Sequence, residues 1–254
     1  MAKGIFESEN LYHFTKYDSA FKILLSQNLL FGKYSDMNDI NETMRVICHS
    51  NLGDDSKEQQ RIKDIEKYQQ LSFTMDIDQN TKGFELSSMW GHYAEKGFGV
   101  CLVFDKEILL GSIKNDSRRY IHKKIIYTND VSNWKSLDDR DVLDEVFFKK
   151  FTDWKYENEY RIIVQSDPKK RESLNIRNSI KAIIMMRVKD TDHIEESIEY
   201  ICISNLLAYL RFNIPIFELY SWINEKSLKC INNKEQYSKN PSWQEFKFST
   251  YHSL

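Results

Sequence analysis

Glycine and proline are scarce in this chain of 254 residues, which contains 8 Gly and 3 Pro. Disordered segments and flexible linkers are usually rich in these two residues, so few such segments are expected here. Hydrophobic residues make up 41% of the sequence, which is enough to form a core. We therefore expect a single domain over residues 1–231, followed by a polar C-terminal tail over residues 232–254.

Closely spaced cysteine pairs and an excess of one charge are also missing. The four cysteines (Cys48, Cys101, Cys202 and Cys230) contain no CxxC pair, so neither a zinc ribbon nor a dithiol redox centre is expected. The chain has 36 basic and 38 acidic residues. This balance gives no overall attraction to nucleic acids or to anionic membranes.

Long apolar runs are absent as well. No run approaches the ~20 residues that cross a bilayer, and the first ten residues contain no apolar signal segment. We therefore expect a cytoplasmic protein that has no membrane partner.

Strand and helix patterns follow one another without strict alternation. Short apolar segments typical of strands lie at residues 11–14, 29–31, 71–75, 98–104, 120–127, 159–164, 182–188 and 214–220. Helical spacing of apolar residues predicts helices at residues 18–28 and 138–151, one long helix or two short ones at 192–212, and a helical insertion near 54–70. This order favours an α+β fold with a mixed or split β-sheet flanked by helices. The phosphate-binding motifs GxGxxG and GxxxxGK[ST] are absent.

The most concentrated group of charged residues lies in the segment from 154 to 161. If this segment is a strand, Glu157, Glu159 and Arg161 point to the same face, because side chains alternate along a strand. A carboxylate there can stabilise an oxocarbenium-like centre, and the guanidinium would tune its pKa. The alternative is a solvated strand edge whose charges discourage aggregation.

Two aromatic segments are further candidates. Tyr12 and His13 lie on opposite faces of a short strand, where a histidine can bind a ribose hydroxyl or transfer a proton. Trp90 and Tyr93 share a helix face and can stack a planar ring. For each segment the commoner alternative is an ordinary core or surface position.

A polar segment at residues 38–42 contains Asn38, Asp39 and Glu42. These residues can form the wall of a pocket, or only the cap and first turn of a helix. Together with Glu157 and Glu159, the two acidic residues of this segment could serve a magnesium-dependent nuclease. The histidines have no ligand-like spacing, and our leading expectation includes no metal.

Several of these motifs together resemble a bacterial family of unknown function, DUF2971, which is often linked to abortive infection and phage defence. The resemblance covers residues 10–190 and is carried by Leu11-Tyr12-His13, Met37-Asn38-Asp39 with Glu42, the stretch from Met89 to Val100, and Trp154 to Arg161.

A more distant resemblance is to the ADP-ribosyltransferases, through Leu11-Tyr12-His13-Phe14-Thr15, a following helix and Leu29-Leu30-Phe31. It implies an ADP-ribosyltransferase-like fold that uses NAD as a substrate. Glu159 or Glu157 would be the catalytic carboxylate, and Trp90 or Tyr93 would stack on nicotinamide. The other contacts would come from His13 on a ribose, from its neighbours Tyr12 and Thr15, from Arg161, and from a polar pocket of Asn38, Asp39, Glu42 and His92.

The function implied by this second resemblance is that of an NAD-dependent ADP-ribosyltransferase or NAD glycohydrolase, acting as a bacterial toxin or phage-defence effector. Its small-molecule partner would be a nucleotide, and the acceptor would be nucleic acid, protein or water. Two rivals stay open: the magnesium-dependent nuclease, and a nucleotide-binding sensor module that leaves its ligand unchanged.

Overall fold

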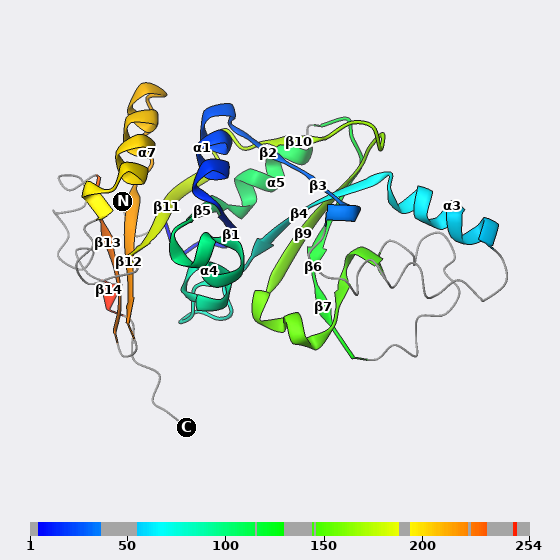
Figure 1. Cartoon of the computed structure of the whole chain (residues 1–254), viewed down its shortest axis with the longest axis horizontal. Coiled ribbons are helices and arrows are strands. Elements are labelled where there is room, and N and C mark those ends of the chain that lie inside the picture. The colour runs from blue at the N-terminus through cyan, green and yellow to red at the C-terminus, as the bar shows by residue number, and fades with distance from the viewer. Residues whose placement is uncertain are drawn as a thin grey trace. The chain divides into compact units, whose positions relative to one another are not determined.

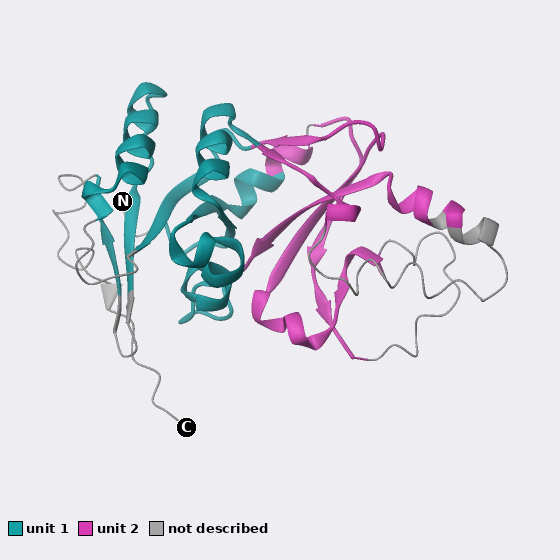
Figure 2. Cartoon of the chain, in the orientation of Figure 1, with its two compact units in different colours: residues 1–28, 76–110, 176–254 teal, residues 29–75, 111–175 magenta. Residues whose placement is uncertain are grey.

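The computed structural model describes residues 5–36, 55–114, 116–129, 144, 146–187, 194–222, 225–232 and 246–247. The chain divides into two compact units, each assembled from segments that are distant in sequence (Figures 1 and 2). Unit 1 comprises residues 1–28, 76–110 and 176–254, and unit 2 comprises residues 29–75 and 111–175. Both units combine β-sheet with helices, so the expected α+β class is confirmed.

Unit 1 contains a mixed sheet whose strands follow the order β14-β13-β12-β11-β5-β1. In chain order these strands are β1 (Asn10–Thr15), β5 (Val100–Asp105), β11 (Ile180–Arg187), β12 (Ile216–Trp222), β13 (Glu225–Cys230) and β14 (Phe246–Lys247). All neighbouring pairs are antiparallel except β11 and β12, which are parallel. The expected mixed sheet is therefore present.

The parallel pair requires a crossover, because parallel strands cannot be joined by a tight turn. The crossover contains the short 3₁₀ helix η6 (Ile194–Glu196) and the helix α7 (Ile198–Tyr209). Ser197 caps α7, since its hydroxyl accepts a hydrogen bond from the backbone N–H of Tyr200 at 3.1 Å. Of the two alternatives predicted over residues 192–212, one long helix or two short ones, the structure shows two helices.

The central strand of this sheet is β5, which lies between β1 and β11. Its residues from Val100 to Phe104 are fully buried, as the continuous apolar run predicts. The remaining helices of unit 1 are α1 (Tyr17–Ser26), η3 (Gly83–Glu85), α4 (Ser87–Tyr93), η4 (Glu95–Gly97) and α5 (Lys106–Lys114), the last of which runs into unit 2.

Unit 2 contains an antiparallel sheet in the order β3-β4-β9-β6. These strands are β3 (Gly32–Lys33), β4 (Tyr68–Thr74), β6 (Tyr120–Lys124) and β9 (Glu159–Gln165). Two small pairs accompany it: β7 (Ile126–Tyr127) is parallel to β8 (Lys149–Lys150), and β2 (Asn28–Leu30) pairs with β10 (Ser173–Asn175). Its helices are η2 (Tyr34–Asp36), α3 (Asp55–Ile65) and η5 (Thr152–Glu157).

One apolar core cluster of unit 2 covers a face of β9. Its buried members are Tyr34, Ile65, Ile125, Val146, Phe147, Phe148 and Ile163. Ile163 lies on the same face of β9 as Glu159 and Arg161, since residues two apart in a strand share a face. The charged start of β9 therefore faces the side of the sheet that this core covers.

Several sequence predictions need correction. The helix predicted over 138–151 is wrong at its end, because Lys149 and Lys150 form β8. The strand predicted over 120–127 is interrupted and becomes β6 and β7. The insertion near 54–70 contains α3, but its last residues belong to β4.

The predicted tail over 232–254 lies largely outside the described residues. Within it, Phe246 and Lys247 form strand β14, which pairs with β13. In the described part of the chain, no helix is long and apolar enough to cross a membrane.

Candidate functional site

Four charged side chains form a buried ion network at the start of β9 in unit 2. The ammonium of Lys150 lies 2.7 Å from Oε2 of Glu157 and 2.9 Å from Oε2 of Glu159. The guanidinium of Arg161 donates to both oxygens of Glu159, from Nε at 2.7 Å and from Nη2 at 3.0 Å. None of the four side chains is more than 8% exposed. Two positive and two negative charges are thus paired away from water.

Strand alternation explains only part of this arrangement. Glu159 and Arg161 share a face of β9, as predicted. Glu157 lies outside the strand, at the end of η5, so strand alternation does not apply to it. Asn158 between them has a left-handed backbone with φ of 43°, which asparagine tolerates better than most residues. Its side chain donates to the carbonyl of Met75 at 3.1 Å, and this bond holds the turn that brings Glu157 to Lys150.

Neighbouring residues also hold the network in place. The hydroxyl of Tyr127 accepts the backbone N–H of Glu159 at 2.8 Å, and Nη1 of Arg161 donates to the carbonyl of Phe147 at 2.7 Å. The ammonium of Lys150 lies 5.3 Å from the ring centroid of Trp154, within the range of a cation–π contact. The pairing of β7 with β8 sets Tyr127 opposite Lys150. These contacts fix the orientation of the charged groups.

Glu159 is ionised at neutral pH. Burial by itself would raise the pKa of Glu159, because the interior solvates a charge poorly. The charges of Arg161 and Lys150 outweigh burial and, with hydrogen bonds from Arg161 and Ser72, hold the pKa of Glu159 well below its ordinary value. Burial also raises the pKa of Tyr127 above its usual range, so its phenol stays neutral.

These findings exclude one of the two interpretations of the segment. β9 pairs with β4 on one side and with β6 on the other, so it is not an edge strand. Glu159 and Arg161 are 2% and 0% exposed, so the interpretation as a solvated edge is wrong. The structure instead shows two carboxylates that converge on one cationic group, an arrangement that stabilises positive charge at that position.

The strand β1 of unit 1 carries the first group of predicted site residues. Tyr12 is fully buried, and its hydroxyl accepts a hydrogen bond from Asn10 at 3.5 Å. Burial, reinforced by the charge of Asp76, raises the pKa of Tyr12 well above its usual value. Tyr12 is therefore a core residue. His13 and Thr15 share the opposite face of β1 and are half-buried.

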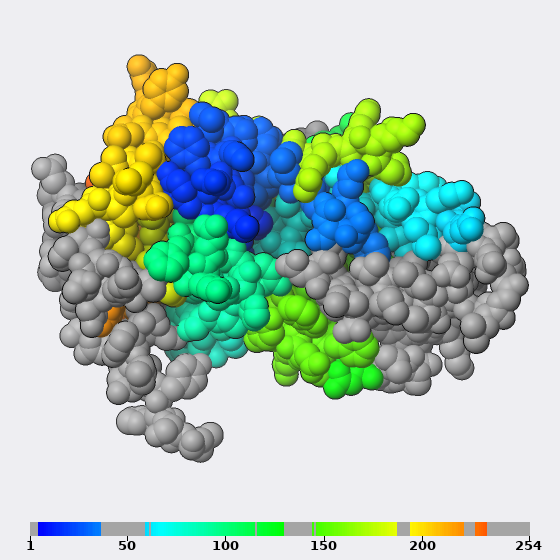
Figure 3. All heavy atoms as spheres, in the orientation of Figure 1, coloured from blue at the N-terminus to red at the C-terminus, as the bar shows by residue number. Residues whose placement is uncertain are grey.

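The aromatic pair of α4 also divides into a core residue and a more accessible one. Trp90 is 2% exposed, donates from its indole N–H to the carbonyl of Phe84 at 2.7 Å, and packs edge-on against Phe14. Trp90 is therefore a core residue, which is one of the two alternatives that the sequence left open. Tyr93 is half-buried and His92 is exposed, so Tyr93 remains the candidate for stacking a ring. Figure 3 shows α4 and the following turn at the surface of unit 1, near α1.

The glycines after α4 serve the packing of unit 1. A Cβ atom on Gly99 would lie 2.7 Å from Cα of Ala94 and would also collide with the carbonyl oxygen of Thr15. Only glycine allows this approach of β5 to β1. Gly97 has φ of 99°, which a residue with a side chain rarely adopts.

The predicted site residues fall into separate groups. The structure brings Glu157, Glu159 and Arg161 together in unit 2. His13 and Thr15 share a face of β1 in unit 1, where His92 and Tyr93 end α4. The predicted polar residues Asn38, Asp39 and Glu42 lie outside the described residues. Among the residues that are described, no group of three or more His, Cys, Asp or Glu is arranged to hold a metal ion.

Two contributors to the network were missed by the sequence analysis. Lys150 was assigned to a predicted helix, and Tyr127 to the end of a strand. The one available signal was charge: two buried glutamates and one arginine leave an uncompensated negative charge, so a further cation is required. Nothing in the sequence says which of the 36 basic residues supplies it.

Comparison with known proteins gives one match. Residues 89–162, which run from α4 through β5 and β6 to β9, match the model of a family described as a protein of unknown function (DUF2971). The match includes the turn at Gly97–Gly99 and the segment that carries the ion network, but not the motifs near His13 and Asp39. No curated protein and no solved structure matches the chain at a significant level. The chain therefore resembles the DUF2971 family over the central third of its length.

Proposed function

We propose that this chain is an NAD-dependent ADP-ribosyltransferase or NAD glycohydrolase with an ADP-ribosyltransferase-like fold, acting in the cytoplasm as a toxin or phage-defence effector. The observation that supports the proposal is the convergence of Glu157 and Glu159 on a single cationic group. A carboxylate that is buried, ionised and fixed in place is what the cleavage of a positively charged glycoside requires.

In the proposed reaction the bond between the ribose anomeric carbon and nicotinamide breaks. Its electron pair leaves with the pyridinium nitrogen, so the positive charge moves onto the ribose. Glu159, aided by Glu157, stabilises this charge. Lys150 would have to leave the space between the two carboxylates, and its flexible stem permits such a movement. Arg161 keeps Glu159 ionised and oriented throughout.

The resemblance to the ADP-ribosyltransferases implies further roles for residues of unit 1. His13 would bind a ribose hydroxyl, with Thr15 beside it, and Tyr93 would stack on a planar ring. An acceptor hydroxyl from nucleic acid, protein or water would attack the anomeric carbon and release its proton. The buried positions of Tyr12 and Trp90 limit these two residues to supporting roles.

The test is nicotinamide release by the full chain and by Glu159→Gln. We expect the substitution to lower the rate by about 10²–10³-fold, the usual loss when one preorganised electrostatic contact is removed. Glu157→Gln serves as a second variant in case Glu159→Gln does not fold, and Lys67→Gln, at an exposed ion pair, is the control. Equal release by the wild type and a folded Glu159→Gln variant would contradict the assignment of Glu159.

A second candidate function is a nucleotide-binding sensor module that does not turn its ligand over. The observation in its favour is that Lys150 and Arg161 already satisfy both oxygens of Glu159, so the charges balance without a ligand. In this case the chain binds NAD and releases no nicotinamide, and Glu159→Gln affects stability rather than binding. Calorimetric titration with NAD separates the two candidates.

A further inference from the structure

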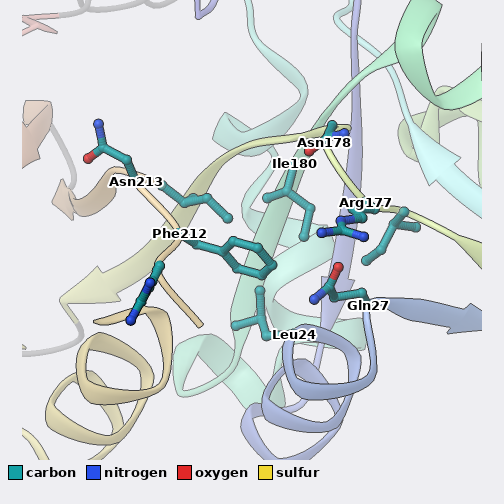
Figure 4. A pocket seen from close by; sticks show the side chains of 10 residues that line it. Leu24, Gln27, Arg177, Asn178, Ile180, Phe212 and Asn213 are labelled. Atoms are coloured by element: carbon teal, nitrogen blue, oxygen red, sulfur yellow. The ribbon is translucent and has the colours of Figure 1, made fainter. Parts of the chain in front are cut away.

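Unit 1 contains a pocket of about 300 Å³, and none of its lining residues is a predicted site residue. It is formed where α1 ends, where the chain enters β11, and where α7 ends. Figure 4 shows the ring of Phe212 pointing toward the side chains of Gln27 and Arg177, with Leu24 below it and Ile180 above it. Leu24 is fully buried, whereas Arg177 is exposed. The pocket thus has an apolar interior and a polar rim.

The position of Phe212 is set by the way α7 ends. After the cap residue Leu210, Arg211 adopts a left-handed backbone with φ of 56°. The backbone N–H of Phe212 then donates to the carbonyl of Leu207 at 2.9 Å, and that of Arg211 to the carbonyl of Ala208 at 3.1 Å. This pair of bonds is a Schellman motif. It fixes the chain at Phe212, so the ring is part of a rigid wall.

Several residues with a left-handed backbone conformation line this pocket. Gln27, Asn178 and Arg211, with φ of 54°, 67° and 56°, are three of the six non-glycine residues with positive φ in the described part of the chain, and all three line the pocket. Glycine is the usual residue at the left-handed position of a Schellman motif. An arginine there costs conformational energy, and such strain is often found where a side chain is needed for binding.

The charge of the lining favours an anion. Arg177 and Arg211 line the pocket, and none of its lining residues is Asp or Glu. The ends of α1 and α7 oppose this, since each helix C-terminus carries about half a negative charge. The lining side chains themselves contribute two full positive charges and no negative charge.

We propose that this pocket binds a nucleoside monophosphate. The base would pack on Phe212, the phosphate would be held by Arg177 and Arg211, and the amides of Gln27 and Asn178 would hydrogen-bond the base edge or the ribose. The volume of about 300 Å³ is at the low end for ligand pockets and suits a mononucleotide rather than a dinucleotide. The inference does not depend on the proposed NAD chemistry and adds a second site to the molecule.

The experiment is calorimetric titration of the full chain with AMP, compared with adenosine and with inorganic phosphate. We expect saturable binding of AMP, and at least tenfold weaker binding of adenosine and of phosphate, since each lacks one half of the recognised structure. Phe212→Ala should weaken AMP binding at least tenfold. The titration does not involve nicotinamide release, so failure of the NAD proposal would not affect this result.

The decisive variants remove the guanidiniums. Arg177→Gln/Arg211→Gln should weaken AMP binding about 100-fold, because two charge-assisted contacts are lost. Lys22→Gln, which removes one exposed positive charge from α1 outside the pocket, should change affinity less than twofold. Arg211→Gly should weaken AMP binding without lowering the unfolding midpoint, because glycine relieves the left-handed strain.

Three results would overturn the proposal. These are the absence of saturable AMP binding by the wild type at millimolar concentration, equal binding of adenosine and AMP, and wild-type affinity in the double arginine variant. The last result would show that the arginines only neutralise the helix ends.

Discussion

The guanidinium of Arg161 is fully buried and donates from all three of its nitrogens, to Glu159 and to the carbonyl of Phe147. A buried charge is tolerated only when it is paired and hydrogen-bonded. A buried ion pair such as Arg161 and Glu159 adds little net stability compared with apolar residues in the same place. Losing one partner, however, leaves the other charge buried and without its counter-charge. Substituting one of the charged residues should therefore lower the stability of the fold more than replacing the whole network by apolar residues.

Arg161→Gln should lower the free energy of unfolding by about 3–5 kcal/mol, because Glu159 then keeps Lys150 but loses its bidentate partner. Urea unfolding measures this change. The matched control is Lys67→Gln at the exposed pair with Asp64, which should cost less than about 1 kcal/mol. Equal effects of the two substitutions would contradict the buried network.

The depressed pKa of Glu159 predicts acid sensitivity. Its folded-state pKa lies below its unfolded value of about 4.3, so its contribution to stability is present above that pH and is lost as the pH falls below it. The free energy of unfolding should therefore drop as the pH falls below about 5. Glu159→Gln should flatten this dependence, leaving the contribution of Asp116, whose pKa is lowered by Arg118. An equally steep dependence in the variant would argue against an ionised Glu159.

For single residues, the sequence predicts contacts between side chains that are close together along one strand. Glu159 and Arg161 are two residues apart, and alternation alone places them together. Lys150 and Tyr127 reach the same network through the pairing of β7 with β8, which is a contact between distant segments. Local patterns carry no information on such a contact.

Among the structural elements, the turn between α4 and β5 is the most tightly constrained. Gly91 and Gly99 lie on either side of Glu95, Lys96 and Gly97, which all have positive φ. A Cβ on Gly99 would collide with backbone atoms, whereas a Cβ on Gly91 would meet nothing within 4 Å. The two glycines thus have different roles within one motif.

Gly99→Ala should destabilise the chain by about 1–3 kcal/mol or more, because the backbone of Thr15 or Ala94 must move to make room. Gly91→Ala, within α4, should stabilise it by about 0.5–1 kcal/mol through higher helix propensity. Thermal unfolding of both variants is the measurement. A stabilising effect of Gly99→Ala would refute the close approach of β5 to Thr15.

Elements with strong local patterns were predicted well. β5 is a nearly continuous apolar run and β9 contains the apolar run Ile162-Ile163-Val164, and both strands were expected within a residue or two of their bounds. β8 was predicted as part of a helix because Lys149 and Lys150 continue a helical spacing, yet pairing with β7 makes them a strand. The short strand β10 was missed, because three residues are too few to show the alternation of side chains that is typical of a strand.

For the whole molecule, the scarcity of glycine and proline indicated few linkers, but the chain crosses between its two units at residues 28/29, 75/76, 110/111 and 175/176. Neither unit is a continuous segment, and no change of composition marks these crossings. The mixed sheet follows from the irregular order of strands and helices, whereas the parallel pairing of β11 with β12 could not be predicted from sequence.

The central claim is that the ion network around Glu159 serves NAD cleavage. The most direct measurement follows nicotinamide release from NAD by the full chain, with and without magnesium and nucleic acid, beside a Glu157→Gln/Glu159→Gln double variant. If the network serves NAD cleavage, the wild type releases nicotinamide without magnesium and a folded double variant does not. No release under any condition, from folded protein that also fails to bind NAD, would contradict it.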